Sequence, residues 1–141
     1  MSHDLDLTTE QQQLADQVRE FADEVVAPAA YEYDTKRELP YGIIAEMGRM
    51  GLFGLPFSPE YGGQGKTYVE LCLAVEQLAR VDQSIAVTLE AGVGLGIMPI
   101  YRRGTEEQKQ RWVPPLARGE ALAGFGLTEA EAGSDAAGTR T

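Results

Sequence analysis

The residues with the clearest capacity for chemistry lie near the C-terminal end of the sequence. Thr128 ends a short apolar run, and Gly133 and Ser134 follow it in a loop of small residues. Hydroxyl groups and main-chain N–H groups gathered in such a turn bind phosphate or carbonyl oxygens. The acidic residues between and beside them oppose a bare phosphate unless their side chains point away. A plain capped turn explains the pattern equally well, so both interpretations stay open on these residues alone.

A second candidate site is the glycine-rich sequence Gly92-Val93-Gly94-Leu95-Gly96. A dinucleotide-binding loop needs a third glycine three residues after the second, but that position is Ile97 and no βαβ pattern surrounds it. Three glycines, each costing about 1 kcal/mol relative to alanine, instead indicate a helix that passes close to its neighbours or lines a groove. Glu90 either faces water at the edge of this helix or supplies a polar group at the end of an apolar pocket.

Composition and charge exclude several classes of site. One cysteine, Cys72, and one histidine, His3 in the polar N-terminal tail, are too few for a disulfide, a zinc cage or a histidine-based triad, so no metal site is expected. Cys72 lies on the apolar side of its predicted helix, where we expect a buried, unreactive thiol. The formal net charge of −10 without a basic cluster argues against nucleic acid and anionic membranes as partners.

Location follows from the same features. The uncharged run Ala91–Tyr101 is too short to span a bilayer, so no membrane contact is expected. The N-terminus carries no basic start followed by an apolar stretch, as a secretory signal would. We therefore expect a cytoplasmic, reducing environment.

Helices must position these residues, and apolar residues at helical spacing predict about five of them. The expected helices cover residues 8–28, 40–51, 67–79, 85–100 and 105–114. Capping boxes begin three of them, at Thr8, Thr67 and Thr105. Short connections favour antiparallel neighbours, so the fold class is expected to be an all-α, antiparallel helical bundle.

Prolines and composition set the limits of these helices. The first is expected to end or kink at Pro28, before a polar loop over 31–38, and the last to stop at Pro114 after the apolar anchors Trp112 and Val113. The helix over 85–100 is apolar on all sides, which predicts a central, buried helix. Residues 52–66, rich in glycine and proline, are expected to form a loop that packs down on the body.

One strand is expected after the helices. Leu122 to Leu127 is a short apolar run, and the helical pattern ends near Gly119. We therefore expect a helical domain over 1–119 and the opening strand of a truncated β domain over 120–141. A lone strand cannot pair its own backbone groups, so the sequence looks cut within a domain.

The C-terminal loop closely resembles the flavin-binding signature of acyl-CoA dehydrogenases. It reads Phe125-Gly126-Leu127-Thr128-Glu129, followed by Ala132-Gly133-Ser134-Asp135. Upstream segments similar to the same family, in the same order, are 52–55 with 59–63, 98–100 with 104–109, and 112–114 with 119–120. The resemblance covers the chain from about Leu7 to Thr141. It departs at Ala130, where the family commonly has a proline.

The resemblance implies an FAD enzyme with helical, β and helical parts that oxidises the Cα–Cβ bond of an acyl-CoA thioester. In this family a glutamate removes a Cα proton, a Cβ hydride passes to flavin N5, and electrons leave through an electron-transfer flavoprotein. The resemblance places that glutamate beyond residue 141, so no catalytic residue is expected in this chain. The chain alone is expected to be inactive and to retain FAD poorly, and the full-length enzyme to be a homotetramer.

The resemblance also implies positions for site residues. Phe125, Leu127 and Thr128 would lie against the flavin, with the Thr128 hydroxyl near its reactive edge. Gly133 and Ser134 would lie by the pyrophosphate and the pantetheine of the thioester. The glycine-containing helix would line the acyl-tail groove, near whose floor we expect Thr88, Glu90, Ala91 and Leu95.

Two alternatives stay open. The chain could be a stand-alone, non-catalytic helical interaction domain that borrows the fold. It could also belong to an acyl-CoA oxidase or a flavin-dependent monooxygenase of the same fold, because the residues that separate these chemistries lie outside it.

Overall fold

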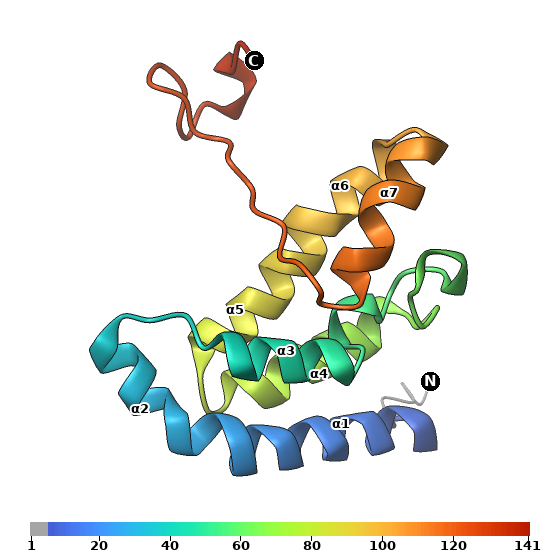
Figure 1. Cartoon of the computed structure of the whole chain (residues 1–141), viewed down its shortest axis with the longest axis vertical. Helices are drawn as coiled ribbons and strands as arrows, with labels where there is room; N and C mark the ends of the chain where they lie inside the picture. The colour runs from blue at the N-terminus through green and yellow to red at the C-terminus, as the bar shows by residue number, and fades with distance from the viewer. Residues whose placement is uncertain (1–5) are drawn as a thin grey trace, which may run out of the picture.

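The computed structural model describes residues 6–141, and His3 lies outside the described residues. The helices are α1 (Thr9–Phe21), α2 (Ala27–Lys36), α3 (Tyr41–Arg49), α4 (Tyr68–Ala79), α5 (Gln83–Ala91), α6 (Met98–Arg103) and α7 (Glu106–Ala117). Two π-helical turns, η1 (Ala22–Val26) and η4 (Gly92–Ile97), join α1 to α2 and α5 to α6. Over residues 6–141 the chain therefore forms five continuous helical stretches, which confirms the predicted all-α class (Figure 1).

Helices begin where the capping patterns predicted. The Thr8 hydroxyl accepts the Gln11 N–H at 3.2 Å, and the Gln11 side chain accepts the Thr8 N–H at 3.0 Å. Thr67 and Thr105 form the same reciprocal box at the start of α4 and α7. Each box satisfies two helix N–H groups that have no partner inside the helix.

The helix does not end at Pro28, and the loop expected over 31–38 is wrong because residues 31–36 are helical. The helix continues through Pro28 to Lys36, because the π-turn η1 comes immediately before the proline. The Ala27 N–H bonds to the Ala22 carbonyl, five residues back. This wider turn relieves the clash between a proline ring and the carbonyl four residues earlier. The second π-turn, η4, lies before Pro99 in the same way.

The expected stop at Pro114 is also wrong, since α7 runs through Pro114 and Pro115 to Ala117. The missing proline N–H groups leave the carbonyls of Gln110 and Arg111 without helical partners, and both residues are exposed to water. Of the two expected anchors in α7, Val113 is buried. Trp112 instead lies at the surface, with the Arg111 guanidinium 4.6 Å from its ring centroid.

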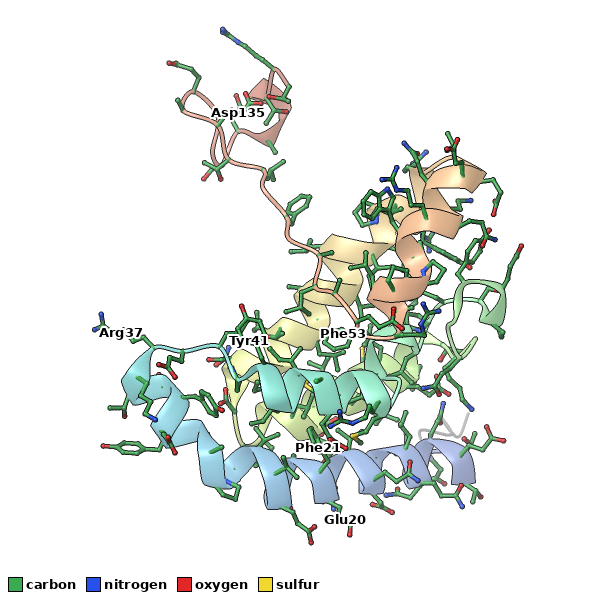
Figure 2. The ribbon with its side chains drawn as sticks, viewed as in Figure 1. Glu20, Phe21, Arg37, Tyr41, Phe53 and Asp135 are labelled. Carbon is green, nitrogen blue, oxygen red and sulfur yellow. The ribbon has the colours of Figure 1, made fainter. Side chains whose placement is uncertain are left out.

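The core lies between α1, α3, α4, α5 and the loop after α3. That loop contains two 3₁₀ turns, η2 (Leu52–Gly54) and η3 (Pro59–Tyr61), and it packs on the helices as predicted. Phe53, Leu55 and Phe57 are almost completely buried. Phe21 and Phe53 point into the space between the helices (Figure 2). Burial of these large side chains is the main source of stability.

The helix predicted over 85–100 is not buried on all sides. Ile85, Leu89 and Val93 face the core, where α5 packs on α4, but Val87 and Leu95 are 50% and 45% exposed. The helical stretch Gln83–Arg103 has 21 residues and contains an 18-residue window with a mean hydropathy of 1.4, so it is long and apolar enough to cross a membrane by length and composition. The prediction of no membrane contact rested on the uncharged run Ala91–Tyr101, which is shorter than this helical stretch. Core helices pass the same test, and one face of this helix is in the core.

Cys72 is exposed, so the expectation of a buried thiol is wrong. The buried face of α4 is formed by Leu71, Ala74 and Leu78. Residue 72 is one position after Leu71 and therefore about 100° away around the helix. The apolar composition of α4 misled the prediction, because most of its residues are apolar whichever way they face.

The strand expected over 122–127 is not formed, and residues 6–141 contain no strand. After α7 the chain runs away from the helices as an open segment and ends in a loop that includes a 3₁₀ turn, η5 (Ala136–Gly138) (Figure 1). A strand is defined by pairing with a neighbour, and this segment has none among the described residues.

Candidate functional site

The exposed face of α5 and η4 carries an apolar stripe. Val87, Ala91 and Leu95 follow one another at intervals of four residues, and Val87 and Leu95 are both about half exposed. Side chains at this spacing lie on the same side of a helix. Sequence reasoning missed Val87, although its spacing from Ala91 was the signal that could have found it.

Thr88 lies at the N-terminal end of this stripe. Its hydroxyl donates to the Ser84 carbonyl at 2.8 Å, so that polar group is satisfied within the helix. Thr88 also lines a groove of about 440 Å³ between α2, the linker after it, and the start of α5. Tyr33, Leu39 and Ile85 are among its apolar walls. The stripe therefore leads into a partly enclosed space at its Thr88 end.

Glu90, the only charged residue in α5 and η4, is exposed at the side of the helix. One of its carboxylate oxygens lies 3.2 Å from the place where a Cβ on Gly94 would stand. Glu90 follows Thr88 by two positions, which places it about 200° further around the helix. The structure thus brings Thr88, Ala91 and Leu95 to one face and leaves Glu90 at its edge, facing water.

The C-terminal loop presents apolar side chains and free main-chain donors together. Phe125 and Leu127 are 52% and 46% exposed, and Thr128 is exposed beside them. The N–H groups of residues 125–128 donate no hydrogen bond to any residue within 6–141. Gly126 and Gly133 have no heavy atom within 4 Å of a Cβ position, so other groups can approach their backbone closely.

Glu129 holds this loop closed on itself. Its N–H donates to the Ala132 carbonyl at 2.9 Å, and its carboxylate accepts the N–H groups of Arg140 and Thr141 at 2.9 and 3.0 Å. The Thr141 hydroxyl also donates to it. These bonds, that of the hydroxyl first, lower the pKa of Glu129. The carboxylate is turned into the loop, which removes part of the electrostatic objection to an anionic ligand at Gly133 and Ser134.

The two candidate groups join at one contact, between η4 and the segment that leads to the loop. A Cβ on Gly96 would lie 2.5 Å from the Ala123 Cβ. Beyond that contact the loop projects away from the helices, with Asp135 near its far end (Figure 2). The residues from Phe125 to Ser134 and those from Thr88 to Leu95 are therefore linked through this junction, but they do not form one enclosed pocket.

Comparison with known families identifies the helical part of the chain. The family described as "Acyl-CoA dehydrogenase, N-terminal domain" matches residues 8–120. This chain belongs to the acyl-CoA dehydrogenase family. Its helices, its connecting loop and the start of the outgoing segment all fall within the matched range.

Individual relatives agree with this assignment. The chain is 46% identical over 136 residues to the probable acyl-CoA dehydrogenase YngJ of Bacillus subtilis, a match that covers 96% of this chain and 36% of that protein. It superposes on butyryl-CoA dehydrogenase from Megasphaera elsdenii with a TM-score of 0.91 and 39% identity, covering 98% of this chain and 37% of that one. It also matches an acyl-CoA dehydrogenase complexed with FAD from Bacillus anthracis, with a TM-score of 0.88 and 37% identity, covering 96% and 23%. This acyl-CoA dehydrogenase chain thus spans about a third of the length of the curated relative.

Proposed function

We propose that this chain supplies the N-terminal helical domain, residues 1–119, and the opening of the middle domain, residues 120–141, of a cytoplasmic, FAD-dependent acyl-CoA dehydrogenase. The observation that carries the proposal is the state of the signature loop. Its apolar side chains are exposed, and its main-chain N–H groups donate no hydrogen bond within the described residues. The segment that leads to it crosses η4 next to an exposed apolar helix face.

The loop fits a flavin by its chemistry. Phe125 and Leu127 offer apolar surface to the ring, and the N–H groups of residues 125–128 are available as donors. The Thr128 hydroxyl adds a donor at the ring edge. Donors aimed at a group that gains negative charge during reduction stabilise that charge. The open backbone at Gly133 and the hydroxyl of Ser134 suit the pyrophosphate and the pantetheine.

The exposed stripe on α5 and η4 is proposed to line the acyl-tail groove. Leu95 precedes the Gly96 contact with Ala123, so it lies at the end nearer the flavin loop. Thr88 lies seven residues earlier, about 10 Å along the helix axis, at the distal end. Val87 and Ala91 form the wall between them. Glu90 is proposed to lie beside the tail, at the edge of this face.

FAD, when bound, supplies the acceptor for the Cβ hydride. The residues of this chain hold the thioester and the ring in position and keep water away from the apolar face. The proton at Cα is taken by a glutamate outside residues 1–141. An electron-transfer flavoprotein as electron acceptor and a homotetrameric assembly complete the proposal.

The test is the full-length protein, purified and assayed with a panel of acyl-CoA thioesters. A visible flavin spectrum and anaerobic reduction of that spectrum by an acyl-CoA are expected, together with electron transfer to an electron-transfer flavoprotein. Hydrogen peroxide formed in air at the same rate would assign the protein to the oxidases. A protein without flavin that no thioester reduces would refute the proposal.

A matched pair of variants tests the loop. Thr128→Ala removes the proposed donor and is expected to lower kcat by about 100-fold, the effect of losing one donor to developing charge. Thr139→Ala is the control, because that hydroxyl bonds only to the nearby Ala136 carbonyl. The 141-residue chain by itself is expected to be colourless and inactive, and a yellow preparation of it would contradict this part of the proposal.

A further inference from the structure

The segment that leads from α7 to the signature loop passes the helices at two close contacts. A Cβ on Gly119 would lie 2.5 Å from the Gly48 Cα, and one on Gly96 would lie 2.5 Å from the Ala123 Cβ. Carbon atoms are at their best separation at about 3.5–4.0 Å, so neither position takes a side chain unless the backbone moves. Gly119 also has a φ of 69°, which favours glycine.

The Gly96–Ala123 contact comes shortly before the loop. Gly124 and Gly126 have no heavy atom within 4 Å of a Cβ position. Ala123 itself is partly buried against the core, whereas Phe125 two residues later is exposed. Where the loop stands is therefore decided largely by how closely Ala123 approaches η4.

The same contact belongs to the apolar helix face. Leu95, at one end of the stripe, is the residue immediately before Gly96, and both lie in the π-turn η4. A glycine at 96 lets the outgoing segment cross the helix at backbone distance. A larger residue would push that segment, and the loop beyond it, away from the end of the stripe.

We propose that Gly96 is a positioning residue, which through its contact with Ala123 sets the separation between the acyl-tail groove and the flavin loop. This inference rests on the function proposed above for those two elements. Gly96 touches neither ligand and acts only through Ala123. It follows that the size of residue 96 and the size of residue 123 compensate for each other.

The test uses four variants of the full-length protein. Gly96→Ala closes the space, and Gly96→Ala combined with Ala123→Gly reopens it from the other side. Gly94→Ala is the matched control in the same π-turn, because a Cβ there meets only the end of the flexible Glu90 side chain, at 3.2 Å. Ala123→Val enlarges the same contact from the extended segment and leaves the helix sequence intact.

The first measurement is a distance that needs no flavin. Nitroxide labels are placed on the native exposed Cys72 in α4 and on Ala130→Cys in the loop, after replacement of every other cysteine by serine, and their separation is measured by pulsed EPR. Gly96→Ala and Ala123→Val are expected to shift this distance distribution. Gly94→Ala and the double variant are expected to keep that of the wild type.

The second measurement uses the flavin-loaded protein. Gly96→Ala is expected to shift the visible flavin spectrum and to lower kcat by about 100-fold, the effect of misplacing reacting groups by about 1 Å, with little change in KM. The double variant is expected to recover both the spectrum and kcat.

Unchanged label distances in Gly96→Ala and Ala123→Val would overturn the proposal, as would equal shifts in Gly94→Ala. If Gly96→Ala fails to fold, Ala123→Val decides the question by the same distance. If the wild-type protein binds no flavin, the proposed function fails, and the label distances still decide whether Gly96 positions the loop.

Discussion

The Tyr61 hydroxyl donates a hydrogen bond to the Glu106 carboxylate, with its oxygen 2.8 and 3.0 Å from the two carboxylate oxygens. Tyr61 lies in η3, on the loop between α3 and α4, and Glu106 is the first residue of α7. The Tyr61 ring also packs edge-on against Tyr101 in α6, with centroids 5.6 Å apart. One buried side chain therefore ties the connecting loop to the helices that lead to the candidate site.

This relationship predicts an alkaline pH dependence. The Glu106 carboxylate, with burial second, raises the pKa of Tyr61 from its ordinary 10.0 to about 12. Because the folded-state pKa lies above the unfolded one, this stabilisation is complete below pH 10 and is lost as the pH rises from 10 towards 12. A tyrosinate absorbance titration of the folded protein should show one tyrosine ionising late. Glu106→Gln should move that late step to lower pH, and Glu107→Gln should leave it unchanged; a late step that Glu106→Gln does not move would refute the assignment.

An acidic pH dependence is expected at the start of α4. The Thr67 hydroxyl, donating to the Glu70 carboxylate, lowers the pKa of Glu70 below its ordinary 4.5. A lowered folded-state pKa means that the contribution is complete above pH 4.5 and is lost as the pH falls through the folded value. Glu70→Gln keeps a capping side chain but cannot titrate. Urea unfolding from pH 7 down to pH 3 should show a smaller loss of stability for Glu70→Gln than for the wild type. An equal benefit from Glu76→Gln, an exposed residue of the same helix, would contradict this cause.

The contact between α1 and α4 contains Gln77, the only buried amide or charged side chain within residues 6–141. The Arg19 Nε donates to the Gln77 amide oxygen at 2.9 Å, and Gln77 is buried. Arg19→Ala leaves that oxygen without a partner, which should lower the free energy of unfolding by about 1–3 kcal/mol. Arg49→Ala removes only an exposed ion pair with Glu46 and should cost about 0–1 kcal/mol. Chemical unfolding of both variants measures the loss in free energy of unfolding. Equal losses would show that the buried hydrogen bond stabilises the fold no more than the exposed ion pair does.

Substitution of a buried phenylalanine should affect stability, whereas substitution of an exposed one in the signature loop should affect flavin binding. Phe53 is almost completely buried, so Phe53→Ala should lower the free energy of unfolding by about 3–5 kcal/mol. Phe125 is exposed in the signature loop, so Phe125→Ala should change stability of the helical part by at most about 0.5 kcal/mol while lowering the flavin content of the full-length protein. Thermal unfolding and the ratio of flavin to protein absorbance measure the two effects. Full flavin content in Phe125→Ala would remove that residue from the flavin site.

The sequence by itself determined the features that depend on neighbours along the chain. Thr8, Thr67 and Thr105 cap helices because a box needs only the residue three positions later. The apolar periodicity identified the five helical stretches, and the signature around Thr128 identified the family. The Leu52–Lys66 loop was predicted to pack on the body, and Phe53 and Phe57 show that it does.

Only the tertiary structure decided which helix faces are covered by neighbours and which helices continue past a proline. Cys72 and Val87 are exposed because neighbouring helices cover the other side of α4 and α5, a choice that composition cannot reveal. Pro28 lies inside a helix because a π-turn makes room for it. The run expected to be a strand stays unpaired because a strand depends on a partner elsewhere. The approach of Ala123 to Gly96 joins residues 27 positions apart, and only folding brings such positions together.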